Sequence, residues 1–171
     1  MEGLGGRGLA RVKIYPGRVS GRVKAPPSKS YTHRAVILAS LSKGESFIEN
    51  PLESRDTLAS LKACRALGAD IRVERDGWRV TGSPRPRCPE DIIDVENSGT
   101  TIRFMTAVSA LTPPGFTVLT GDASIRRRPM EPLLKSLREL GVECWSMRMN
   151  GCLLYTSDAA DEGLGVDLGG R

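Results

Sequence analysis

Aromatic residues make up only 5% of the 171-residue sequence, and histidine occurs once, at His33. No apolar run approaches the roughly 18–20 residues that span a bilayer, and the N-terminus lacks the apolar core of a secretory signal. The four cysteines (Cys64, Cys88, Cys144 and Cys152) form no C-x-x-C pair, and with one histidine they make no zinc set. We therefore expect a cytoplasmic protein with free thiols, no bound metal and no cofactor.

Positive charge is what the sequence has in excess. It carries 25 Lys and Arg against 20 Asp and Glu, a net charge of +5, and its 39% hydrophobic residues suffice for a packed core. A basic surplus is typical of proteins that bind nucleic acid, acidic lipid or small anionic substrates. The places of the cations along the chain must decide among these three.

The composition changes near the C-terminus. Residues 152–171 (CLLYTSDAADEGLGVDLGGR) are rich in glycine and aspartate and show no amphipathic pattern. Two blocks, 152–162 and 165–171, resemble the translation of a common transposon-based sequencing adapter, separated by a gap that fits a sample index. We expect 152–171 to be a non-native tail outside the fold. Without it the chain has 24 basic and 16 acidic residues, a net charge of +8.

Two stretches about seventy residues apart are similar. SKSYTHRAVILASL (28–41) aligns with SGTTIRFMTAVSAL (98–111), and each has a small polar start, then an arginine, then an apolar helical run. We expect the two arginines, Arg34 and Arg103, to take equivalent places. Residues 61–80 align in turn with 134–151 as a helix ending in Leu-Gly, an alternating strand and a tight turn. A period of this length predicts supersecondary units stacked on one another, of which the second is incomplete.

Local signals give boundaries in the first unit. Either Ser28 or Ser30 is expected to cap the first helix, and either Ser54 or Asp56 the second. Gly68 is the expected residue just past the end of the second helix.

Turn signals complete both units. The Asp-Gly pair at 76–77, between alternating apolar residues, predicts a hairpin, and the Asn-Gly pair at 150–151 predicts its counterpart. Pro129 is expected in the first turn of a helix that runs to Leu140.

The segment PPSKS (26–30) leads from an extended stretch into a helix N-terminus. Free backbone N–H groups and the positive end of the helix dipole favour an anion there. Lys29 adds a mobile charge, Ser30 a hydroxyl donor, and Arg34 a planar fork suited to phosphate or carboxylate. The alternative is a capped helix with surface charges. His33, in the same segment, is expected to pack or cap rather than to catalyse.

The segment ENSGTT (96–101) repeats this arrangement at the second helix start. Asn97 precedes it, Gly99 lets backbone approach a ligand closely, Thr100 can cap or donate, and Arg103 supplies a second fork. Arg128 closes a run of three arginines beside another helix start. Such a run is also typical of a solvated face or a nucleic-acid patch.

Four motifs in this order, APPSKSYTHRA, ENSGTTIRF, LTGDASIRRRPM and EPLLKSLRELG, resemble the N-terminal part of the EPSP synthase (3-phosphoshikimate 1-carboxyvinyltransferase) family. The resemblance runs over residues 12–151, about a third of the usual family length. It implies an α/β (α+β) fold of repeated βαβαββ units around buried parallel helices, here truncated. Residues 1–23 would form a leading strand segment that belongs to an absent opposing domain. Residues 24–151 would form the first two units of the enolpyruvyl transferase domain.

The resemblance also implies a reaction. The 5-hydroxyl of shikimate 3-phosphate adds to phosphoenolpyruvate, and the resulting tetrahedral ketal phosphate eliminates inorganic phosphate. The implied full-length enzyme is a monomer with these two small-molecule substrates. The family's proton-transfer residues lie beyond residue 151, so we expect the chain alone to be inactive.

Site residues carry over by position. Lys29, Ser30 and Arg34 match residues that hold shikimate 3-phosphate. Lys29 also matches a catalytic position and, with Gly99 and Arg128, the phosphoenolpyruvate site. Neighbouring motif positions form a second tier of candidates: Asn97, Thr100 and Arg103.

Two other functions compete with this interpretation. The sister enzyme that uses UDP-N-acetylglucosamine has Lys-Asn where this chain has Lys29-Ser30. A basic nucleic-acid-binding module would fit the +8 charge, but the chain is poor in aromatics and shows no base-stacking motif. Its cations also sit at helix starts rather than along one face.

Overall fold

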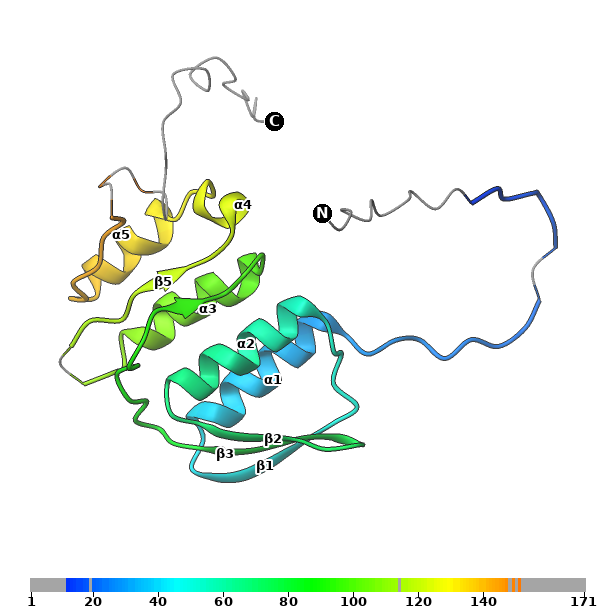
Figure 1. The fold of residues 1–171 in the computed structure, drawn as a ribbon, viewed down its shortest axis with the longest axis horizontal. Coiled ribbons are helices and arrows are strands. Elements are labelled where there is room, and N and C mark those ends of the chain that lie inside the picture. Colours follow the sequence, from blue (N-terminus) through cyan, green and yellow to red (C-terminus); the bar gives the residue numbers. More distant parts are fainter. Residues whose placement is uncertain (1–11, 19, 114, 148, 150, 152–171) are drawn as a thin grey trace, which may run out of the picture.

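The structure, a computed structural model, describes residues 12–151 apart from 19, 114, 148 and 150 (Figure 1). The first half contains α1 (Lys29–Leu41), β1 (Gly44–Glu49), α2 (Arg55–Ala66), β2 (Asp70–Val73) and β3 (Gly77–Gly82). The second half contains β4 (Ile93–Asp94), α3 (Gly99–Ser109), β5 (Leu119–Thr120), α4 (Ala123–Arg126) and α5 (Glu131–Glu139). The mixture of helices and sheets confirms the expected α+β class. The tail predicted at 152–171 lies outside the described residues.

The first three long helices begin with serine caps. The Oγ of Ser28 accepts from the N–H three residues on at α1, and the Oγ of Ser98 does the same at α3. Ser54 and Thr57 form a reciprocal capping box at α2. Ser28 and Ser98 are repeat-equivalent, so the local signal and the repeat agree.

The arginines of the two repeats are not equivalent. Arg34 stands six residues after its cap, Ser28, whereas Arg103 stands five residues after Ser98. One residue turns an α-helix by about 100°, so the two side chains leave their helices in different directions. The expectation of equivalent places is wrong, because the repeat matches the helix starts and not each side chain that follows.

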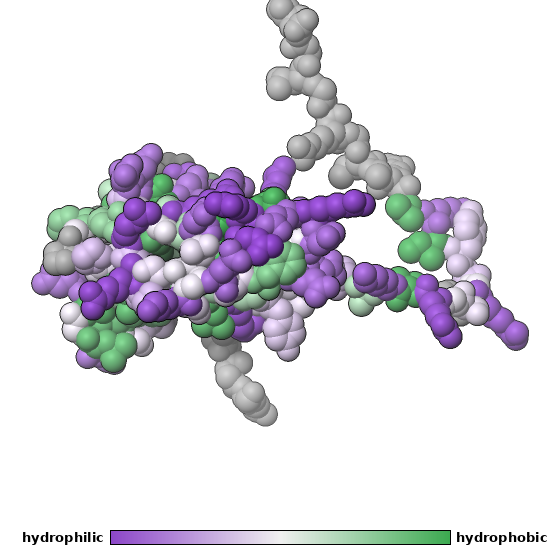
Figure 2. Space-filling model, turned by 90° about the horizontal axis from the view of Figure 1, so that it is seen from below, coloured by the Kyte–Doolittle hydropathy of each residue, from purple (hydrophilic) through white to green (hydrophobic). Residues whose placement is uncertain are grey.

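A three-stranded antiparallel sheet in the order β1-β3-β2 lies under the helices (Figure 1). Trp78 and Val80 of β3 point to the helices and are fully buried, while Arg79 between them faces out. Its guanidinium pairs with Glu45 and Glu74, each at 2.7 Å. The outer face of the sheet is accordingly mostly hydrophilic in Figure 2. The sheet therefore has one core face and one solvated face.

The predicted hairpin forms between β2 and β3, but Gly77 has a different role from the one expected. It is the first residue of β3 and does not adopt a positive φ. A Cβ at this position would meet the carbonyl oxygen of Ile48 on the neighbouring strand, so close strand approach requires the glycine. Gly68 does adopt a positive φ, +101°, just past α2, as predicted.

The second unit departs from its prediction in two places. Pro132, not Pro129, stands in the first turn of α5, since the helix begins at Glu131. An alternating strand was expected between the Leu-Gly pair at 140–141 and the Asn-Gly pair at 150–151, yet residues 142–147 form no strand. In the first unit the equivalent strand, β2, is held by β3, whereas 142–147 find no strand partner in the described part of the chain. Asn150 of the predicted second turn lies outside the described residues.

The segment before α1 leaves the body of the molecule as an arm (Figure 1). Its described residues form no helix or strand, and Val12, Ile14 and Val23 are exposed. Its pairing with an opposing domain stays a prediction. Within the described residues, no helix combines the length and apolar character needed to cross a membrane.

Helices α1, α2 and α3 run in the same direction through the core. Their starts meet at one end, where Lys29, Asp56 and Gly99 line a common pocket. Val36 of α1, Leu61 of α2 and other buried residues of the same cluster fill the space between them. Parallel packing thus brings the positive ends of three helix dipoles to one place.

Candidate anion-binding site

An open pocket of about 740 Å³ lies at the common N-terminal end of α1, α2 and α3. Six of the eight predicted site residues line it: Lys29, Asn97, Gly99, Thr100, Arg103 and Arg128. These residues come from segments up to about a hundred positions apart. The fold therefore gathers most of the predicted anion-binding residues in one cavity.

Two helix starts present unused backbone donors to this region. The caps Ser28 and Ser98 each satisfy only the N–H three residues on. In the part of the chain that the structure describes, the N–H groups of residues 29, 30, 99 and 100 make no hydrogen bond. Free N–H groups at the positive end of a helix are a ready-made cradle for phosphate or carboxylate.

Lys29 is held by an acid across the pocket. Its Nζ lies 2.6 Å from Oδ2 of Asp56 at the start of α2, with about half of the lysine side chain exposed. An ion pair this exposed contributes roughly 0–1 kcal/mol, so an incoming phosphate can replace the carboxylate. Asp56 was expected only as a possible helix cap, and Ser54 takes that role. The pairing joins residues 27 positions apart and has no local signal in the sequence.

Two arginine side chains, those of Arg103 and Arg128, lie close to the backbone of Gly99. A Cβ built on Gly99 would lie 2.4 Å from Nη1 of Arg128 and 3.5 Å from Nη1 of Arg103. Arg103 also donates from Nη1 to the carbonyl of Gly99 at 3.0 Å. A glycine therefore lets both guanidinium groups approach the start of α3 closely, which concentrates positive charge over its free N–H groups.

Asn97 connects this cluster to α4. Its Nδ2 donates to Oδ2 of Asp122, and the other carboxylate oxygen of Asp122 accepts from the N–H of Ile125 at 2.9 Å. These bonds, the one from Asn97 first, lower the pKa of Asp122 below its ordinary value. Asn97 is thus engaged in holding the turn that leads to Arg128, a contact that the motif alone did not indicate.

Ser30 and Arg34 do not line the pocket. Both are exposed on α1, where Nη1 of Arg34 donates to the carbonyl of Ser30 at 3.1 Å. They share a face because they are four residues apart, and that face is turned by roughly 100° from Lys29. The three residues predicted to hold one substrate therefore span two adjacent faces of α1.

Apolar side chains form the remaining wall of the pocket: Phe104, Ala107 and Leu133. Sequence reasoning did not assign them to the site. Their helical spacing is the same as that of ordinary core residues, so no signal distinguished them.

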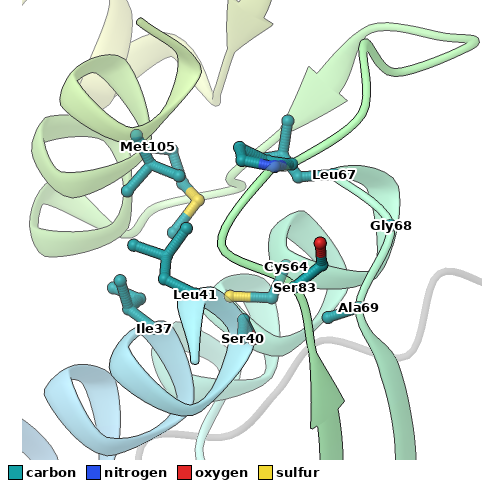
Figure 3. A pocket seen from close by; sticks show the side chains of 11 residues that line it. Ile37, Ser40, Leu41, Cys64, Leu67, Gly68, Ala69, Ser83 and Met105 are labelled. Carbon is teal, nitrogen blue, oxygen red and sulfur yellow. The ribbon is translucent and has the colours of Figure 1, made fainter. Parts of the chain in front are cut away.

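A second cavity near the far ends of the helices is not a ligand site. Its volume is about 10 Å³, close to the space of one water molecule, and its lining is largely apolar. Cys64 and Met105 contribute sulfur atoms to it (Figure 3). Burial raises the pKa of Cys64 to about 11. No group of three or more metal-ligating side chains occurs among the residues that the structure describes.

The fold and the pocket together define a class: repeated α+β units whose helix starts and cations converge on an anion site. The EPSP synthase (3-phosphoshikimate 1-carboxyvinyltransferase) family profile matches residues 14–168. The chain therefore belongs to the EPSP synthase family.

Individual relatives agree. The chain is 59% identical over 137 residues to the 3-phosphoshikimate 1-carboxyvinyltransferase of Methanothermobacter thermautotrophicus, covering 79% of this chain and 32% of that protein. It is 54% identical over 133 residues to the Methanococcus vannielii protein of the same name, covering 78% and 31%. An EPSP synthase structure from Acinetobacter baumannii superposes with a TM-score of 0.70 at 29% identity, covering 77% and 30%. The chain thus spans about a third of the length of these relatives.

Proposed function

We propose that this chain supplies one side of the active site of a 3-phosphoshikimate 1-carboxyvinyltransferase. The enzyme would transfer the enolpyruvyl group of phosphoenolpyruvate to the 5-hydroxyl of shikimate 3-phosphate, on the route to chorismate and aromatic amino acids. One observation carries the proposal: six candidate residues and two helix N-termini with unused N–H groups converge on one pocket. Membership of the family and the names of the relatives support it.

The chemistry of this reaction requires such a site. Two phosphates and a carboxylate must be held close together, and their mutual repulsion must be offset by fixed positive groups. Phosphoenolpyruvate would lie between Lys29 and Arg128, over the start of α3 at Gly99. Shikimate 3-phosphate would extend from Lys29 along the exposed face of α1 that carries Ser30 and Arg34.

Binding alone does not complete the reaction. Addition places a proton on C3 of phosphoenolpyruvate and takes one from the 5-hydroxyl, and elimination removes a proton from C3 as phosphate leaves. Among the residues that the structure describes, Asp56 is the only carboxylate that lines the pocket, and it is engaged with Lys29. His33 is buried below the surface. We therefore propose that this chain by itself gives no turnover.

The proposal is tested by titrating the ¹⁵N-labelled chain with phosphoenolpyruvate and with shikimate 3-phosphate. We expect saturable shifts of the amides of Gly99 and Thr100. Arg128→Gln should weaken phosphoenolpyruvate binding at least tenfold, since it removes a charge-assisted donor. Arg72→Gln is the matched control, because Arg72 is an exposed arginine of β2 outside the pocket. Equal losses in both variants, or no binding of either compound to the folded chain, would contradict the proposal.

The same titration separates the competing functions. Saturable binding of UDP-N-acetylglucosamine in place of shikimate 3-phosphate would favour the sister enzyme. Salt-dependent binding of random oligonucleotides without a phosphoenolpyruvate response would favour a nucleic-acid module. Release of inorganic phosphate from phosphoenolpyruvate plus shikimate 3-phosphate would refute the predicted inactivity of the chain.

A further inference from the structure

A chain of hydrogen-bonded side chains crosses the core directly beneath the pocket. Nδ1 of His33 on α1 lies 2.7 Å from Oγ of Ser60 on α2. The same Oγ lies 2.7 Å from Oγ1 of Thr101 on α3, which lies 2.6 Å from Oγ of Ser98. All four side chains are at most 1% exposed. We call these four residues the buried polar chain.

The buried polar chain joins α1, α2 and α3 through hydrogen bonds. Each polar group that leaves water costs free energy unless it is hydrogen-bonded, and apolar side chains would fill the same space at no such cost. Hydrogen bonds are directional, so this chain is satisfied only when the three helices have one rotation about their axes and one axial position relative to each other. Nε2 of His33 has no hydrogen-bond partner within the described part of the chain, so even this arrangement carries a residual cost.

One assignment of protons satisfies every hydroxyl of the chain. Thr101 donates to the carbonyl of Asp56, 3.3 Å away, and accepts from Ser60 and Ser98. Ser60 then accepts from Nδ1–H of His33, so in the neutral ring Nε2 carries no proton. Burial, the largest influence, lowers the pKa of His33, which agrees with a neutral ring. Through Thr101, the buried polar chain is therefore bonded to the backbone of Asp56, the residue whose side chain holds Lys29.

At Ser98 the buried polar chain reaches the start of α3. Ser98 is the cap of α3 and stands immediately before Gly99, and its Oγ accepts from the N–H of Thr101 at 3.2 Å. Thr101 thus contacts both the first turn of α2 and the cap of α3. These two elements carry opposite sides of the pocket, the Lys29–Asp56 pair and the unused N–H groups of Gly99 and Thr100.

We propose that Thr101, as the centre of the buried polar chain, is a positioning residue that holds the first turn of α3 at a set distance from Lys29. This inference rests on the proposed function. The anion then meets donors from α1 and α3 that are already in place, so little of its binding energy is lost in ordering them. Without the hydroxyl the two helix starts can shift relative to one another while the apolar core below keeps the helices packed.

The decisive variant is Thr101→Val, which removes the hydroxyl and keeps a β-branched side chain of similar size. We expect its phosphoenolpyruvate dissociation constant to rise about five- to twentyfold, with changed amide shifts at Gly99 and Thr100. Thr101→Ser should restore affinity to within about twofold. Thr106→Val is the matched control, since Thr106 lies on the same helix and its Oγ1 bonds only within that helix, to the carbonyl of Ile102.

The outcomes separate this inference from the function on which it rests. If the unaltered chain binds neither phosphoenolpyruvate nor shikimate 3-phosphate, the proposed function fails. If it binds and folded Thr101→Val binds equally well, or Thr106→Val loses as much affinity, the positioning role is overturned. Should Thr101→Val not fold, Ser60→Ala replaces it, because alanine is favourable within α2. Unchanged affinity in Ser60→Ala would overturn the inference in the same way.

Discussion

Replacing Gly99 by alanine is the sharpest perturbation that the pocket offers. The added methyl carbon would lie 2.4 Å from Nη1 of Arg128, whereas ordinary contact begins near 3.5 Å. The guanidinium must therefore retreat by about 1 Å. If the guanidinium moves away from the ligand by this amount, a hydrogen bond between them lengthens from about 2.9 Å to about 3.9 Å, beyond the range in which it contributes. The change acts on ligand binding through a side chain that is itself unaltered.

The loss can be bounded. A hydrogen bond to a charged group contributes about 1.5–3 kcal/mol, so the dissociation constant for phosphoenolpyruvate should rise roughly 10- to 150-fold. The substitution should not destabilise the fold. Gly99 is the first residue of α3 and does not adopt a positive φ, and alanine favours helix. The free energy of unfolding is expected to stay the same or to rise.

Calorimetric or NMR titration with phosphoenolpyruvate measures the first quantity, and urea denaturation measures the second. Gly17→Ala serves as control, since nothing lies within 4 Å of a Cβ there. In an Arg128→Gln background the Gly99→Ala change should lose most of its effect, because the group that it displaces is gone. Equal losses from Gly99→Ala with and without Arg128 would refute this account of the glycine.

Three further predictions follow from the core. In the native chain, buried Cys64 should resist alkylation at pH 7.5 because its pKa is raised to about 11, whereas half-buried Cys144 should react. Mass spectrometry of the labelled peptides measures both, and rapid labelling of Cys64 in the native chain would contradict this expectation. The pKa of His33 is lowered by burial, so its unfolded state binds more protons, and the free energy of unfolding should fall as pH drops below about 6.5. Urea denaturation from pH 8 to 5.5 checks this, and an unchanged slope in His33→Gln would count against it. Ser54→Ala removes the cap of α2 and should lower the free energy of unfolding by about 1 kcal/mol in the same assay, whereas Ser83→Ala, outside any helix, should not.

Local sequence signals predicted local structure well. Ser28, Ser54 and Gly68 mark helix ends where they were expected, because caps and a positive φ depend on neighbouring residues only. The signals misled where a partner mattered. The alternating pattern at 142–147 formed no strand, since a strand needs a neighbour to bond, and Gly77 proved to serve close strand packing rather than the turn.

The sequence by itself determined the family, the helix starts and the residue types suited to anions. Each of these depends on short stretches of neighbouring residues, so it can be inferred without knowing what the stretch contacts in the fold. Only the tertiary structure decided that Lys29, Gly99 and Arg128 share one pocket, while Ser30 and Arg34 lie outside its lining on an adjacent face of α1. The reason is physical: these residues lie far apart in the chain, and their distances are set by how the parallel helices rotate and dock in the core.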